Sequence, residues 1–216
     1  MSASSAAAEH AAMANSNVLA LPIRGDVWRG RRRSAPVPAL PTGHAGLDAL
    51  LPARGWPVGM LCEILHEGDG VGELRVVMPA LAQLARQARP VIWIAPPYQP
   101  YAPALDAHGL PLSAQRIVQA DNDRQALWAA EQCLRAGCCA AVLLWPSTLS
   151  TTAARRLQLA AETGRGHGFV FRHRRHLADA SPAPIRLSVR RQDVSIWLHV
   201  DKCRGLLAPP AGEIAL

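Results

Sequence analysis

Lysine is nearly absent from this chain, which has one lysine, Lys202, against 22 arginines in 216 residues. Nucleotide-binding loops of the form G-x-x-x-x-G-K-[ST] use a lysine to reach the β- and γ-phosphates and a hydroxyl to hold Mg²⁺. The glycine-rich stretch with a similar outline, residues 66–72, is followed instead by Glu73 and Leu74. A high-GC genome explains scarce lysine, but it does not place an acid at this position. The sequence therefore predicts a glycine-rich turn without the groups that phosphoryl transfer requires.

Paired cysteines and long apolar runs are missing as well. The five cysteines are an odd number without a C-x-x-C pair, which is typical of small buried residues in a reducing compartment. His173 and His176 have the spacing of two metal ligands, but no second pair follows, so no metal is expected. Residues 1–20 resemble neither a signal peptide nor a membrane helix. A cytoplasmic protein without membrane association or cofactor is expected, with Met1 or Met13 as its start.

Positive charge is plentiful, because the net charge is +7. Residues 24–33 contain five arginines against Asp26, and a second cluster comprises Arg172, Arg174 and Arg175. Clusters of this kind indicate contact with nucleic acid or with an acidic protein. The alternative is an ordinary solvated surface.

Composition divides the chain into three regions. Residues 1–38 are rich in Ala and Ser, then basic, then rich in proline, which is typical of a flexible arm. Trp28 inside this arm indicates a docking peptide, with local packing on the domain as the alternative. Residues 39–207 are predicted to form the domain, and residues 208–216 a C-terminal tail.

Short apolar runs alternate with segments of helical spacing through the domain. The predicted strands cover residues 60–65, 90–95, 115–119, 139–144 and 167–171, followed by a hairpin over 185–189 and 194–200. The predicted helices cover residues 41–51, 74–88, 102–108, 124–136 and 150–162, with Gly137 and Gly164 closing the last two. This order indicates an α/β fold with a mostly parallel sheet, helices on both faces and a C-terminal antiparallel hairpin. Ligands of such folds bind at the carboxyl ends of the strands.

The order of elements over roughly residues 40–205 resembles the core of the RecA ATPases. The local match is Pro41-Thr42-Gly43, Leu47-Asp48, Gly55, Gly59 and Glu63-Ile64, followed by a glycine-rich turn and a helix. Three strand ends depart from the RecA pattern. Glu73, or Gly72 with a one-residue gap, replaces the lysine, Ala95-Pro96-Pro97 replaces the catalytic glutamate, and Leu144-Trp145-Pro146 replaces the metal-binding aspartate. The resemblance implies a RecA-like domain that is not an enzyme, with a degenerate P-loop at Gly68, Gly70, Gly72 and Glu73.

A degenerate RecA-like chain of this size resembles the ImuA family, which is also similar to the cell-division inhibitor SulA. The segments that carry the resemblance are 72–75, 93–97, 101–105, 127–132 and 155–162. It implies a non-catalytic accessory of SOS-induced, error-prone translesion DNA synthesis. Its implied partners are an inactive Y-family-like polymerase of the ImuB type and an error-prone replicative-type polymerase, the DNA polymerase alpha subunit. Contact with RecA, contact with single-stranded DNA and self-association stay open.

Several positions are candidate contact residues. The glycines favour a tight structural turn over residual nucleotide binding, although Arg75 is one cation that could reach a phosphate. The loop 172–184 corresponds to the DNA-contacting loop of RecA, but it has no aromatic residue for base stacking. Lys202 and Arg204 match a basic pair that RecA-like subunits present to a neighbour. In a second copy this pair would meet a pocket carrying Glu67, Asp69 and Glu73.

Two other functions stay open at this stage. A SulA-like inhibitor of cell division shares the fold, but such chains tend to lack the Thr-Gly and Leu-Asp segment kept here at 42–48. A weak DNA-dependent ATPase of the recombinase class is disfavoured, because it predicts a P-loop lysine.

Overall fold

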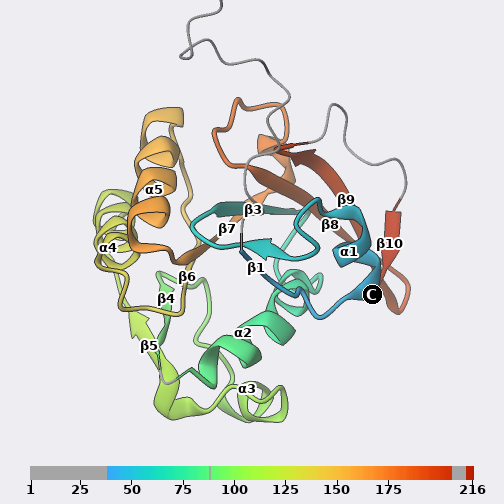
Figure 1. Cartoon of the computed structure of the whole chain (residues 1–216), viewed down its shortest axis with the longest axis horizontal. Helices are drawn as coiled ribbons and strands as arrows, with labels where there is room; N and C mark the ends of the chain where they lie inside the picture. The colour runs from blue at the N-terminus through green and yellow to red at the C-terminus, as the bar shows by residue number, and fades with distance from the viewer. Residues whose placement is uncertain (1–37, 88, 206–212) are drawn as a thin grey trace, which may run out of the picture. The chain divides into compact units, whose positions relative to one another are not determined.

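An eight-stranded sheet runs through the part of the chain that the computed structural model describes, residues 38–87, 89–205 and 213–216 (Figure 1). These residues belong to one unit, Pro36–Leu216. Apart from Pro38, the predicted arm with its Trp28 lies outside the described residues. The strands lie in the order β10-β9-β8-β3-β7-β6-β4-β5. Their bounds are β3 Leu61–His66, β4 Val91–Ile94, β5 Gln115–Val118, β6 Ala141–Leu144, β7 His167–His173, β8 Ile185–Gln192, β9 Ser195–Cys203 and β10 Glu213–Ala215.

The predicted α/β architecture is confirmed. The strands from β5 through β3 to β8 pair in parallel, and β9 returns antiparallel to β8 as the predicted hairpin. Residues 213–215, predicted as part of a tail, form β10 and pair antiparallel with β9. A separate two-stranded sheet joins β1 (Ala39–Leu40) to β2 (Trp56–Pro57).

Helices cover both faces of the sheet. Successive side chains of its buried strands point to opposite faces, so each face presents apolar side chains that helices must cover. Ile92 and Ile94 pack in one core with α4 (Asp123–Ala136) and α5 (Thr151–Gly164). Trp93 packs in the other core with α1 (Ala45–Leu50), α2 (Met78–Ala85) and α3 (Ala102–Ala107). In Figure 1, α4 and α5 lie side by side, away from α2 and α3. None of the described helices combines the length and apolar character that a membrane crossing requires.

Local signals explain where the two longest described helices, α4 and α5, begin. Asn122 caps α4, because its side chain accepts a hydrogen bond from the backbone N–H of Gln125. The helix ends at Gly137, whose φ of 64° is left-handed. Ser150 caps α5 in the same way through the N–H of Ala153.

One helix prediction was wrong in detail. The predicted helix 74–88 is a 3₁₀ turn, η1 (Glu73–Val76), followed by α2, because Pro79 fits only in the first turn of a helix. Gly164 is the last residue of α5 as predicted, but the residue in the left-handed position is Arg165. A Cβ on Gly164 would lie 1.9 Å from the Leu134 carbonyl oxygen. The glycine is therefore needed for the close approach of α5 to the end of α4.

Candidate functional site

The glycine-rich loop 66–72 leaves the carboxyl end of β3 and leads into η1. Gly72 has a φ of 100°, which favours glycine strongly over other residues. The loop presents its backbone N–H groups to the side chain that follows it. Gly72 donates to one carboxylate oxygen of Glu73 at 3.1 Å, and Gly70 donates to the other at 3.5 Å. Glu73 is 8 % exposed.

This arrangement places an internal anion at the turn. Successive backbone N–H groups form a concave site that binds phosphate in many proteins. Here the carboxylate of Glu73 takes those donors, so a phosphate would have to displace a buried acid from its own loop. Arg75, which sequence analysis singled out as a phosphate contact, lies exposed in η1.

A cleft of about 280 Å³ opens at the carboxyl ends of the strands. It lies between the loop after β3, the loop after β6 and the end of β7. Trp145 forms part of its wall and is stacked between Phe171 and Trp93, with ring centroids 4.6 Å and 5.9 Å away. Asp69 is the one carboxylate among the described lining residues. This end of the sheet therefore presents aromatic and basic groups where a metal-dependent enzyme would need acids.

The arginine cluster divides into buried and exposed members. Arg172 was predicted to contact DNA or a partner, but its side chain is 3 % exposed and lies among acids of the same chain. It donates to Asp179 at 3.2 Å and lies 3.8 Å from Glu63. Arg174 and Arg175 are exposed, and Arg174 pairs with Glu67 at 2.7 Å. Arg172 thus takes part in a buried ion-pair network, and its predicted contact with DNA or a partner stays a prediction.

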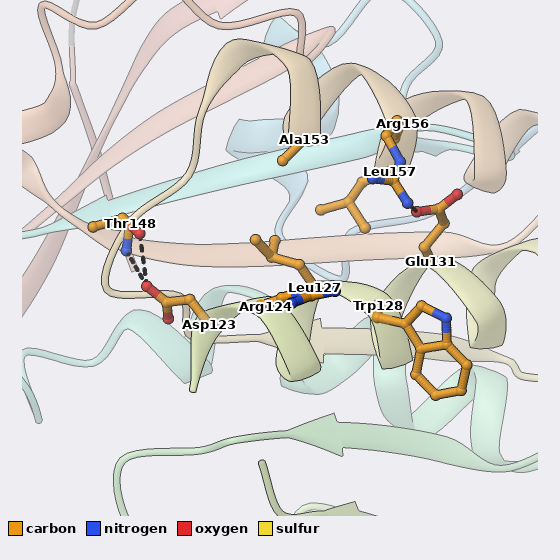
Figure 2. Close-up of a pocket in the computed structure, with 9 residues that line it drawn as sticks. All are labelled: Asp123, Arg124, Leu127, Trp128, Glu131, Thr148, Ala153, Arg156 and Leu157. Carbon is orange, nitrogen blue, oxygen red and sulfur yellow. Dashed lines mark hydrogen bonds and ion pairs between the residues drawn. The ribbon is translucent and has the colours of Figure 1, made fainter. Parts of the chain in front are cut away.

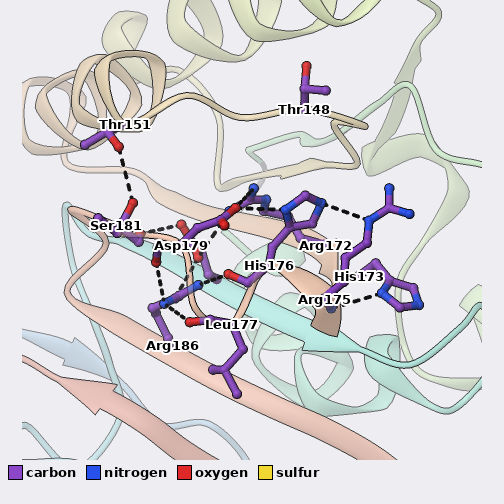
Figure 3. A network of polar contacts seen from close by, with 12 residues as sticks. Thr148, Thr151, Arg172, His173, Arg175, His176, Leu177, Asp179, Ser181 and Arg186 are labelled. Atoms are coloured by element: carbon purple, nitrogen blue, oxygen red, sulfur yellow. Dashed lines mark hydrogen bonds and ion pairs between the residues drawn. The ribbon is translucent and has the colours of Figure 1, made fainter.

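A polar network beneath this cluster holds the loop 174–184 against the sheet (Figure 3). Its centre is Glu63, fully buried on β3, which accepts a hydrogen bond from Arg186 of β8 at 2.9 Å and another from Ser181. The remaining Arg186 donors reach the backbone carbonyls of His176, Leu177 and Asp179, at 2.8–3.1 Å. One guanidinium thus organises most of the loop.

His176 in the loop and His173 at the end of β7 make further polar contacts beside this network. His176 donates from Nδ1 to Asp179 at 2.8 Å and accepts from Arg175 at Nε2. The hydrogen bond from His176 to Asp179 is the main cause that lowers the pKa of Asp179. His173 accepts from the Arg175 N–H. Among the described residues, no group of three or more His, Cys, Asp or Glu side chains could hold a metal ion.

The basic pair near the end of β9 is also divided. Lys202 donates to the Ser181 carbonyl at 2.7 Å, and burial, followed by nearby Arg186 and Arg204, lowers its pKa. Arg204 is exposed. Of the acids predicted to face this pair in a second copy, Glu67 is engaged by Arg174, and Glu73 by its own loop. Two of the three acids thus have partners within the chain, and the contact of this pair with a second copy stays a prediction.

The buried ion pair of Glu63 and Arg186 and the surface between α4 and α5 were not predicted from the sequence. A signal for the ion pair was present, because Glu63 interrupts the apolar run of β3 and Arg186 interrupts that of β8. Both residues lie in the middle of a sheet, where an unpaired charge is costly. The spacing of 123 residues hid their pairing.

Comparisons with known proteins point to one group. Residues 59–168, about half of the chain, match the family described as cell division inhibitor SulA. Protein ImuA of Caulobacter vibrioides is 29 % identical over 186 residues, covering 84 % of this chain and 75 % of ImuA. SulA of Yersinia enterocolitica is 32 % identical over 116 residues, covering 53 % and 68 %. The crystal structure of SulA from Pseudomonas aeruginosa is 28 % identical, with a TM-score of 0.44 over 52 % of this chain and 97 % of that one. The chain belongs to the SulA family, and its predicted resemblance to the ImuA family is confirmed.

Proposed function

We propose that this protein is a non-catalytic, RecA-like accessory of SOS-induced, error-prone translesion DNA synthesis. In this role it acts as an adaptor between an inactive Y-family-like polymerase of the ImuB type and an error-prone replicative-type polymerase. The observation that carries the proposal is the extent of the similarity to ImuA, which covers 84 % of the chain. The similarity to SulA of Yersinia enterocolitica covers 53 %. Both relatives fit an accessory role in the SOS response.

The glycine-rich loop supports the non-catalytic part of the proposal. Phosphoryl transfer depends on positioning and on charges that stabilise the transferred phosphoryl group. In this chain the loop N–H groups bind Glu73, and the ends of β4 and β6 lead into Ala95 and Trp145. We interpret the loop as a degenerate P-loop in which a carboxylate has replaced the phosphate.

We expect no ATP hydrolysis by the purified protein, with or without single-stranded DNA. The physical reason is the acid in the loop and the missing metal ligand at the end of β6. Phosphate release is the measurement, with an active recombinase as the positive control. DNA-stimulated turnover that is lost in Arg75→Ala, an exposed substitution that leaves the core intact, would contradict this expectation.

Inhibition of cell division is the second candidate function, because the SulA family covers residues 59–168. Deleting the gene and overproducing the protein separate the two functions. We expect deletion to reduce damage-induced mutagenesis and overproduction to leave cell length unchanged. Filamentation on overproduction, with mutagenesis intact in the deletion strain, would instead favour the cell-division function.

We expect Arg174 and Arg175, the exposed arginines of the loop 174–184, to contribute to binding of single-stranded DNA. Each phosphate contact to a single strand contributes about 0.7 to the slope of log affinity against log salt concentration. Replacing Arg174 and Arg175 with alanine should therefore weaken binding and lower that slope by about 1.4. The measurement is a titration at several salt concentrations. Arg86→Ala is the matched control, because Arg86 is exposed at the far end of α2. An unchanged slope in the double variant would mean that the two arginines only face solvent.

A further inference from the structure

The outer surface of α4 and α5 carries a groove that the proposed function has not used (Figure 2). It has a volume of about 470 Å³ and runs between the two helices. We call it the α4–α5 groove, and its lining residues are Asp123, Arg124, Leu127, Trp128, Glu131, Thr148, Ala153, Arg156 and Leu157. Leu127 and Leu157 point into it from opposite helices.

Trp128 is the most exposed large apolar residue of this surface, with 62 % of its area accessible. It lines the α4–α5 groove and also a second hollow of about 370 Å³ on α4 that it shares with Arg124. An indole standing between two hollows offers apolar area on both sides. Exposed tryptophan and arginine are the residue types that most often dominate binding energy at protein interfaces.

The acids that line the groove are already satisfied within the chain. Asp123 accepts hydrogen bonds from the Ser147 N–H, the Thr148 N–H and the Thr148 hydroxyl, at 2.8–2.9 Å. Glu131, 5 % exposed, forms ion pairs with Arg135 and Arg156. Neither carboxylate is available to an incoming cation.

Positive charge outnumbers negative charge around the groove. The lining residue Arg124 is exposed and makes no ion pair with any other described residue. Arg135 and Arg156 keep 50 % and 60 % of their side chains exposed beside the single charge of Glu131. These three arginines exceed the charges of Asp123 and Glu131 by one, which favours a ligand with negative charge around an apolar centre.

Charge decides which occupant fits. A second copy related by a twofold axis would bring the same arginines against each other. The N-terminal arm of this chain is itself basic, with five arginines in residues 24–33. A nucleic acid would meet the arginines around the groove, but its phosphates find only apolar side chains and occupied carboxylates deeper in the groove. An amphipathic helix can place apolar side chains between the two helices and acids against these arginines.

We propose that the α4–α5 groove is the docking surface for an acidic, amphipathic helix of the polymerase-like partner, with Trp128 as its anchor. The inference rests on the proposed function, because that function supplies the partner. It places recognition of the partner on the exposed surface of α4 and α5. The loop 172–184 and the pair Lys202 and Arg204 belong to other elements of the chain.

The test is equilibrium binding between the full-length chain and the full-length polymerase-like protein. We expect Trp128→Ala to weaken binding about 30-fold, which is the effect of an interface hot spot of about 2 kcal/mol. Arg124→Glu should weaken binding and also reduce its salt dependence. Tyr98→Ala is the matched control, because Tyr98 is 70 % exposed but lies in the loop after β4. Thermal unfolding of each variant checks that the fold is retained, as expected for exposed side chains.

The outcomes separate the two ideas. If the wild-type chain binds the partner and Trp128→Ala binds equally well, the docking surface is wrong and the proposed function stands. If the wild-type chain does not bind the partner, the proposed function fails, and the docking proposal fails with it. Loss of single-stranded DNA binding in Trp128→Ala, with partner binding intact, would reassign the groove to nucleic acid. A selective loss of partner binding supports the proposal.

Discussion

Replacing Glu63 with alanine is expected to lower the free energy of unfolding by about 3–5 kcal/mol, because it leaves buried arginines without their counter-charge. Glu63 is fully buried, and the side chains of Arg172 and Arg186 are 3 % and 7 % exposed. After the substitution, Asp179 is the one acid still in contact with Arg172 among the described residues. The loss should be measured by chemical denaturation at neutral pH.

Two further variants separate charge from shape. Glu63→Gln keeps the size and shape of the side chain and one of its two acceptor oxygens but removes its charge, so we expect an intermediate loss. Glu67→Ala removes an exposed pair with Arg174, in which the two side chains are 52 % and 44 % exposed. Such pairs contribute about 1 kcal/mol or less. If Glu63→Ala costs no more than Glu67→Ala, the network does not hold the fold as we describe.

The same network has a consequence for the loop 174–184. Arg186 holds three of its carbonyl groups, and Lys202 holds a fourth, at Ser181. In Glu63→Gln we therefore expect faster amide hydrogen exchange in this loop than in α4 or α5. That result would link a buried pair in the sheet to the exposed arginines that we propose for DNA.

The glycine-rich turn should respond to alanine in a graded series, with Gly72→Ala costing about 2–4 kcal/mol in the free energy of unfolding. Gly72 combines a left-handed φ of 100° with crowding, since a Cβ there would lie 2.1 Å from the Ile196 Cδ1. Gly70 has a φ of 77° but nothing within 4 Å, so its alanine variant should show only backbone strain of about 1–2 kcal/mol. Gly68 has neither feature, and its variant should be close to wild type.

Ile196 provides the internal control for this series. The clash expected in Gly72→Ala involves the far end of the Ile196 side chain. Ile196 lies in the core and is 3 % exposed. If crowding is the cause, Gly72→Ala should cost less when Ile196 is already alanine, and a double-mutant cycle measures that coupling. Equal losses at Gly68, Gly70 and Gly72 would show that the turn does not depend on the geometry described here.

Much of the fold was predictable because its signals are local. The apolar runs that became β4 and β6 are short and bounded by turn residues, so their identity as buried strands needed no tertiary information. The caps Asn122 and Ser150 are likewise local, because each acts on an N–H three residues later. Gly164 marks the end of α5 as predicted, but nothing in the sequence indicated that this glycine also permits the close approach of α5 to the end of α4.

The candidate contact residues were harder to predict, because a charge cluster in sequence says nothing about burial. Arg172, Arg174 and Arg175 lie within four residues, yet the first is buried and the other two are exposed. The difference arises because Arg172 still lies within β7, beside the strand that carries Glu63, whereas Arg174 and Arg175 lie in the 3₁₀ turn Arg174–His176 that follows β7. Trp128 shows the converse, because the helical pattern around it gave no sign that it stands exposed between two hollows.

The amino-acid sequence was enough to predict the alternation of strands and helices, the glycine-rich turn with an acid behind it, and the resemblance to ImuA and SulA. Each of these depends on residues that are close together or on pattern alone. Three features emerged from packing instead: Glu73 binds its own loop, Glu63 joins Arg186 across 123 residues, and α4 and α5 leave a groove around Trp128 with an excess of positive charge. These features depend on which side chains meet across the sheet and between the helices, because burial and the pairing of charges are properties of the packed chain.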